Sequence, residues 1–173
     1  MKTKNHSPIE MMKIIQRGIA GHLTYISAVG GWGTTSELAL YPPIGSILLS
    51  RGWMPHCQYK LSSLERQRGA PRTIDFVAFN KETKIQTIAI EIKLLKTKHQ
   101  SKKLNLDKDI KKLTQFRKEN KNSDAFLLIV GRKIDFQNLE IFNNKEKLST
   151  GICKPIVADV GKTSWGSFIA RIV

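Results

Sequence analysis

The 173-residue chain has little cysteine and no long apolar run, and both shortages narrow its class. Only Cys57 and Cys153 occur, and their spacing matches no zinc-binding pattern. A single disulfide would be a weak framework, so we expect reduced thiols and a cytoplasmic protein. No stretch approaches the length of a membrane span, and Lys13, Arg17 and His22 interrupt the apolar residues near the N-terminus. We therefore expect neither a secretory signal nor a membrane partner.

Two common ligand-binding signatures are also missing. The four histidines are scattered along the chain and form no metal-binding pattern. Gly161-Lys162-Thr163 matches the end of a phosphate-binding P-loop, but Ile156 stands where that motif needs its first glycine. The sequence therefore predicts no zinc centre built on histidine and no P-loop.

Acidic residues are scarce relative to basic ones. Fourteen Asp and Glu stand against 29 Lys and Arg, which gives a formal net charge of +15. Such an excess favours a polyanionic partner, either nucleic acid or an anionic membrane surface. The alternative is a basic protein with an even coat of charge.

The remaining composition is that of one globular domain, and we expect residues 1–173 to form a single domain. The pattern predicts an α/β fold, with a central mixed sheet of four or five strands and helices on both faces. Apolar periodicity predicts helices that begin at residues 8, 36 and 106, with Pro42-Pro43 interrupting the second and a short helix following at 44–50. The expected strands are 53–61, 73–79, 85–94, 125–130 and 156–160, and Trp165, Phe168 and Ile172 are expected to form a C-terminal packing element.

The chain is organised around a predicted β-hairpin that carries two carboxylates and a lysine. In the second strand Glu91 and Lys93 share one face, opposite Ile90 and Ile92. Asp75 in the first strand joins that face if the numbers of paired residues sum to an even value. An ion pair on a solvated face would explain these charges without any function. The surrounding apolar residues instead indicate a central strand, where charged side chains need a partner or a metal.

Two carboxylates beside a lysine suit one kind of chemistry. Asp75 and Glu91 offer the oxygen ligands that Mg²⁺ or Mn²⁺ prefers. Lys93 could hold a water molecule or stabilise the charge that develops on a phosphoryl group. These parts favour metal-assisted hydrolysis of a phosphodiester.

Asp75, followed sixteen residues later by Glu91-Ile92-Lys93, resembles the PD-(D/E)XK motif of the restriction-endonuclease-like nucleases. The resemblance covers roughly residues 36–130, with Ile74 where the motif's name has proline. It implies a restriction-endonuclease-like core and a Mg²⁺- or Mn²⁺-dependent nuclease, most simply a DNA endonuclease. It implies that Asp75, Glu91 and the Ile92 carbonyl bind the metal and that Lys93 assists the attacking water. It also implies contributions from Glu37, on the preceding helix, and from Gln115, on the following one.

Basic residues surround this motif and are the expected contacts to the nucleic-acid backbone. An ordinary solvated surface is the alternative for all of them. Two further readings of the chain are a nucleic-acid-binding module of the same fold that does not cleave, and a basic protein-interaction factor. A homodimer would let so small a chain cut both strands. The expected contacts are Arg66, Arg68, Arg72, Lys102, Lys103, Lys108, Lys111, Lys112 and Gln115.

Overall fold

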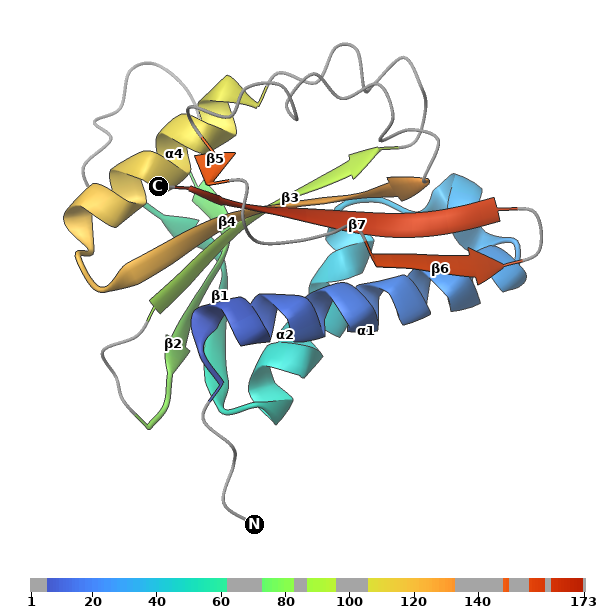
Figure 1. The fold of residues 1–173 in the computed structure, drawn as a ribbon, viewed down its shortest axis with the longest axis horizontal. Coiled ribbons are helices and arrows are strands. Elements are labelled where there is room, and N and C mark those ends of the chain that lie inside the picture. The colour runs from blue at the N-terminus through green and yellow to red at the C-terminus, as the bar shows by residue number, and fades with distance from the viewer. Residues whose placement is uncertain are drawn as a thin grey trace.

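The computed structural model describes residues 6–61, 73–82, 87–95, 106–132, 148–149, 156–160 and 163–172. They form an α/β fold in three layers, with a mixed sheet between helices on its two faces (Figure 1). None of the described helices is long and apolar enough to cross a bilayer. In chain order the elements are α1 (Pro8–Ala28), η1 (Gly31–Thr34), η2 (Leu38–Leu40), α2 (Tyr41–Ser50), β1 (Trp53–Lys60), β2 (Thr73–Asn80), β3 (Thr87–Leu95), α4 (Asp107–Glu119), β4 (Ser123–Arg132), β5 (Leu148–Ser149), β6 (Ile156–Val160) and β7 (Thr163–Ile172).

The expected α/β fold with a mixed sheet is confirmed. Five strands lie side by side in the order β1-β2-β3-β4-β7, and the short strands β5 and β6 both pair with β7. The pair β3 and β4 is parallel and is joined through α4, while the other pairs are antiparallel. The C-terminal segment, expected only as a packing element, is a strand that completes the sheet beside β4.

Helices α1 and α2 cover one face of the sheet. Helix α1 begins at Pro8, where Ser7 and Glu10 form a reciprocal capping box. Its buried stripe, with Met12, Ile15 and Ile19 at helical spacing, packs with alternate residues of β3 and β4 in one core. The expected interruption of the second helix at Pro42-Pro43 is wrong. Both prolines lie in the first turn of α2, where backbone N–H groups have no partner within the helix, so their missing N–H groups cost no hydrogen bond.

Helix α4 covers the other face. Leu106, Leu113 and Phe116 pack with Val77 and with Leu127 of β4, as the predicted stripe requires. Strand β4 is buried on both faces, because its even-numbered side chains face α1 and its odd-numbered ones face α4. The expectation of a doubly covered central strand at 125–130 is therefore confirmed.

Candidate active site

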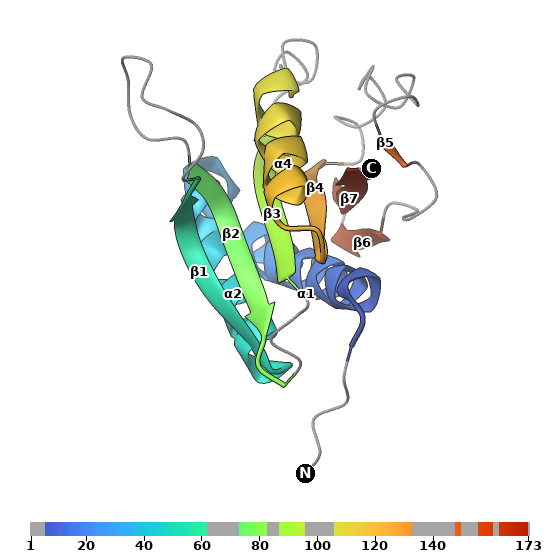
Figure 2. The same ribbon diagram turned by 90° about the vertical axis from the view of Figure 1, so that its left-hand side faces the viewer.

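The candidate site lies where β2 and β3 separate. Their pairing runs from Phe79↔Thr87 to Phe76↔Ile90, and every pair sums to the same even number. This is the even parity that the expected shared face requires, and the pairing stops one step before Asp75 and Glu91. Beyond that point the two strands diverge (Figure 2).

Because the strands diverge, one edge of β3 has no partner strand here. Two carboxylates accept the hydrogen bonds that a partner strand would otherwise accept. The Ile92 N–H donates to Asp75 Oδ2 at 2.8 Å, and the Leu94 N–H donates to Glu37 Oε1 at 3.1 Å. Glu37, which lies just before η2, therefore binds the same edge of β3 as Asp75. In a strand the N–H and C=O of one residue point to the same edge, so the Ile92 carbonyl also faces this opening.

Asp75 is held by two side chains that the sequence did not single out. Tyr41, the first residue of α2, donates its hydroxyl to Asp75 Oδ1 at 2.6 Å. Gln58 Nε2 donates to Tyr41 Oη at 2.6 Å and lies 3.4 Å from the same Asp75 oxygen. Gln58 has a φ of 52°, a left-handed conformation that is unusual for a residue with a side chain. Burial and the neighbouring Asp75 raise the pKa of Tyr41, so its hydroxyl stays a donor.

Glu91 is buried against helix α4. Its side chain is 1% exposed, and Lys112 Nζ of α4 lies 2.6 Å from its Oε1 atom. This is an ion pair by distance, although Oε1 has no hydrogen bond of good geometry among the described residues. Lys112 Nζ also lies 3.1 Å from Asp109 Oδ1 and donates to the Thr73 carbonyl at 3.1 Å.

Asp109 lies near a helix N-terminus, where a negative charge is favourable. In the structure it also contacts lysines of the site. A better signal is its place three residues after Leu106 and four before Leu113, on the stripe that packs against the sheet. A carboxylate on a buried stripe requires a cationic partner. Asp109 has two, because its Oδ2 atom also lies 3.2 Å from Lys93 Nζ.

Burial controls the protonation of these groups. Burial raises the pKa of Glu91 to about 8, the Asp75 charge adds to the rise, and Lys112 opposes it. Burial lowers the pKa of Lys93, but the charges of Asp109 and Glu37 outweigh it and leave that pKa above its ordinary value. Burial likewise lowers the pKa of Lys112, and its contacts with Glu91 and Asp109 raise it further than burial lowers it. Both ammonium groups are therefore charged at neutral pH.

These residues form one group that we call the carboxylate–lysine cluster. When all of them are ionised, the carboxylates outnumber the ammonium groups by two, which is the charge of one divalent cation. The cluster comprises Glu37, Asp75, Glu91, Lys93, Asp109 and Lys112.

The donor set fits a magnesium-type ion. In the described part of the chain no three His, Cys, Asp or Glu side chains converge as a ready-made metal cage. Mg²⁺ does not require one, because it keeps several waters and uses one or two carboxylates. Asp75 and the Ile92 carbonyl lie on the same opening, the charge of Asp75 acts on the adjacent Glu91, and the buried Glu91 Oε1 still lacks a well-formed hydrogen bond among the described residues.

The expected nucleic-acid contacts divide into three groups. Lys108 and Lys111 are exposed on α4. Lys112, expected among the surface lysines, turns inward to the cluster, and Gln115 donates to Glu119 Oε1 at 2.7 Å instead of pointing into the site. The remaining predicted contacts lie outside the described residues: Arg66, Arg68, Arg72, Lys102 and Lys103.

No protein-family model, no curated protein and no solved structure matches this chain.

Proposed function

We propose that the chain is a divalent-metal-dependent nuclease that hydrolyses phosphodiester bonds, with DNA as the substrate. The observation that carries the proposal is the juxtaposition of Asp75 and Glu91 where β2 and β3 separate. Asp75 accepts from the N–H of Ile92, next to Glu91, and its charge helps to raise the pKa of the buried Glu91, so the two carboxylates repel. A metal ion between them would be attracted to both carboxylates and would remove their mutual repulsion.

The order and pairing of the elements also support the proposal. From α2 to β4 the chain runs helix, three antiparallel strands, helix, and a strand parallel to the third. This arrangement agrees with the restriction-endonuclease-like core that the sequence motif resembles.

In this proposal Asp75, Glu91 and the Ile92 carbonyl hold Mg²⁺ or Mn²⁺, while Tyr41 fixes the orientation of Asp75. When bound, such an ion would supply an acidified water and would neutralise charge on the phosphate. Lys93, whose side chain is 23% exposed, donates to the attacking water and stabilises the charge that develops at the phosphate. The water oxygen bonds to phosphorus as the bond to the leaving alkoxide breaks. The proton lost by the water passes to solvent, and the alkoxide takes one from solvent.

The test is cleavage of plasmid, single-stranded and branched DNA with Mg²⁺, with Mn²⁺ or with EDTA. Cleavage that EDTA abolishes is the expected result. Asp75→Asn keeps the size of the side chain and should lower the single-turnover rate by at least about 10²-fold, and Lys93→Met should do the same by removing a donor. Glu119→Gln on the exposed face of α4 is the control. Wild-type cleavage by Asp75→Asn would contradict the proposal.

One observation favours a second candidate, a module of the same fold that binds nucleic acid without cutting it. Both ammonium groups of the cluster already contact carboxylates, as they would in a purely structural ion-pair network. Such a module would bind DNA with a steep salt dependence and show no cleavage with either metal.

A further inference from the structure

The Lys112 ammonium is surrounded by oxygen atoms from three parts of the fold, and we call this position its seat. Its ammonium nitrogen lies 2.6 Å from Glu91 Oε1 of β3, 3.1 Å from Asp109 Oδ1 of α4 and 3.1 Å from the Thr73 carbonyl of β2. Three oxygens around one positive centre form a cation site, and here the cation belongs to the chain.

This seat overlaps the proposed metal position. Glu91 is almost fully buried, and the Lys112 ammonium lies directly on its Oε1 atom. Mg²⁺ binds carboxylate oxygens at about 2.1 Å, so an ion on the same oxygen would be within a few ångströms of the ammonium. Two cations so close in a buried site repel strongly. Lys112 and a metal on Glu91 Oε1 therefore exclude each other.

Lysine is suited to leave such a seat. Its charge stands on a flexible four-carbon stem, so the ammonium can move by several ångströms while the α4 backbone stays in place. Asp109 lies three residues earlier on the same helix and remains within reach after Lys112 leaves Glu91. The ammonium would then stay beside the site, next to Asp109.

We propose that Lys112 is a positioning residue that serves as an internal counter-ion, occupying the Glu91 position in the metal-free protein and giving it up when a divalent ion binds. The inference rests on the metal site of the proposed function, but not on cleavage. It makes Lys112 the residue that sets how tightly the site binds its metal. A surface lysine would have no such effect.

The first experiment is calorimetric titration of EDTA-stripped protein with Mn²⁺, without DNA. Lys112→Met keeps the apolar stem and removes the competing charge, so Mn²⁺ should bind about tenfold more tightly or better. Lys111→Met is the matched control, since it removes the same charge from an exposed neighbour. Its affinity should stay within about twofold of wild type. Equal affinities for the two variants, or weaker binding by Lys112→Met, would overturn the proposal.

A second experiment uses the wild-type protein and so does not depend on the folding of a variant. Lysines are acetylated briefly with and without saturating Mg²⁺, and labelling at each position is read by peptide mass spectrometry. Lys112, whose side chain is 17% exposed, should label severalfold faster with Mg²⁺, while Lys111 should not change. An unchanged Lys112 rate in Mg²⁺-saturated protein would overturn the proposal.

These outcomes separate the two proposals. Tighter Mn²⁺ binding by Lys112→Met without any DNA cleavage would support the counter-ion role and overturn the nuclease. Metal-dependent cleavage with unaltered Mn²⁺ affinity in Lys112→Met would support the nuclease and overturn the counter-ion role. Absence of Mn²⁺ binding in wild type and both variants would overturn both.

Discussion

Glu91 shows how strongly a buried position changes an ordinary side chain. Its neighbours on the same face of β3 include Ala89 and, across the sheet, Leu127, so water does not solvate the carboxylate. The charge of Asp75 also acts on it, and among the described residues Lys112 compensates at close range. The ionised Glu91 carboxylate is therefore costly to the metal-free fold.

The pKa of Glu91 gives a pH-dependent stability. Its pKa is about 8 in the folded protein, against an ordinary value of 4.5, so the folded state binds the extra proton between these values. Stability therefore falls as pH rises through this window and levels off above it. Without metal, Glu91→Gln should flatten this fall and make the protein more stable than wild type above pH 8.

The measurement is urea denaturation between pH 5 and about 9 in EDTA, following the free energy of unfolding. Glu119→Gln, which changes an exposed carboxylate of α4, should retain the wild-type slope. Identical slopes for Glu91→Gln and wild type would show that Glu91 is ionised in the folded protein throughout, contrary to its burial.

Among the elements, β3 and β4 set the geometry of the site because they run parallel and pack closely. Their register extends from Thr87↔Ser123 to Leu95↔Gly131 and holds the Glu91 and Lys93 side chains toward α4. At the end of this pairing the strands approach closely. A Cβ placed on Gly131 would lie 2.8 Å from the Leu95 Cβ and 3.0 Å from the Leu95 carbonyl oxygen.

Gly131→Ala should therefore destabilise the protein by about 1–3 kcal/mol, because both clashing atoms are fixed to the β3 backbone. Gly45→Ala is the matched control. Gly45 lies inside α2 with nothing within 4 Å of an added Cβ, so alanine there should be neutral or stabilise by up to about 1 kcal/mol. Thermal unfolding of both variants measures the difference, and equal midpoints would contradict close packing of β3 against β4.

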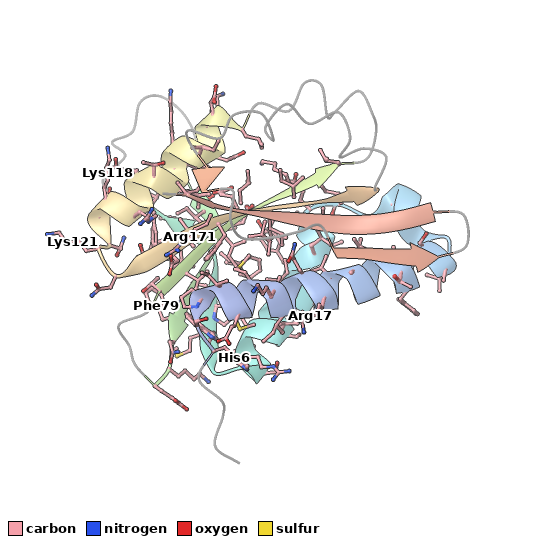
Figure 3. The ribbon with its side chains drawn as sticks, viewed as in Figure 1. His6, Arg17, Phe79, Lys118, Lys121 and Arg171 are labelled. Carbon is pink, nitrogen blue, oxygen red and sulfur yellow. The ribbon has the colours of Figure 1, made fainter. Side chains whose placement is uncertain are left out.

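On the scale of the whole molecule, charge is unevenly distributed. The chain carries +15 overall, yet the carboxylate–lysine cluster has more acidic than basic groups. Exposed lysines occur along α4, and Figure 3 shows Lys118 and Lys121 at the outer surface where that helix ends. A basic exterior favours a polyanion such as a nucleic-acid backbone, whereas the acidic cluster favours a cation.

The proposed DNA binding predicts which lysines control its salt dependence. Changing Lys108 and Lys111 to Gln together should weaken binding to every sequence. It should also reduce the slope of log K against log salt by up to about 0.9 for each phosphate that the protein no longer neutralises. Lys112→Gln, measured in EDTA, should leave the slope unchanged because its ammonium is directed inward.

The pair Lys118→Gln and Lys121→Gln removes the same charge at the other end of α4 and should have a smaller effect. Fluorescence anisotropy over a range of salt concentrations gives the slopes. If the Lys108 and Lys111 pair behaves like the Lys118 and Lys121 pair, the N-terminal half of α4 is not the surface that binds DNA.

The sequence alone determined the elements and the faces of the central hairpin. Alternation along β3 and the spacing of apolar residues in α1 and α4 follow from the local geometry of strands and helices, which a short stretch of chain carries completely. For Asp75 and Glu91 to share a face, the numbers of paired residues in β2 and β3 must sum to an even value. The pairs in the structure do so. The same local reasoning failed at Pro42-Pro43, because the helix starts later than expected and takes both prolines into its first turn.

Only the tertiary structure decided which residues complete the site. Tyr41 and Asp75 are 34 positions apart, and Glu37 and Leu94 are 57 apart, so their contacts depend on how the layers pack and on where β2 leaves β3. Lys112 lies in a run of basic residues typical of a surface, and only the docking of α4 turns it toward Glu91. Local patterns record which face a side chain occupies. Its partner on another element is set by packing and by strand divergence, which no single segment of the chain specifies.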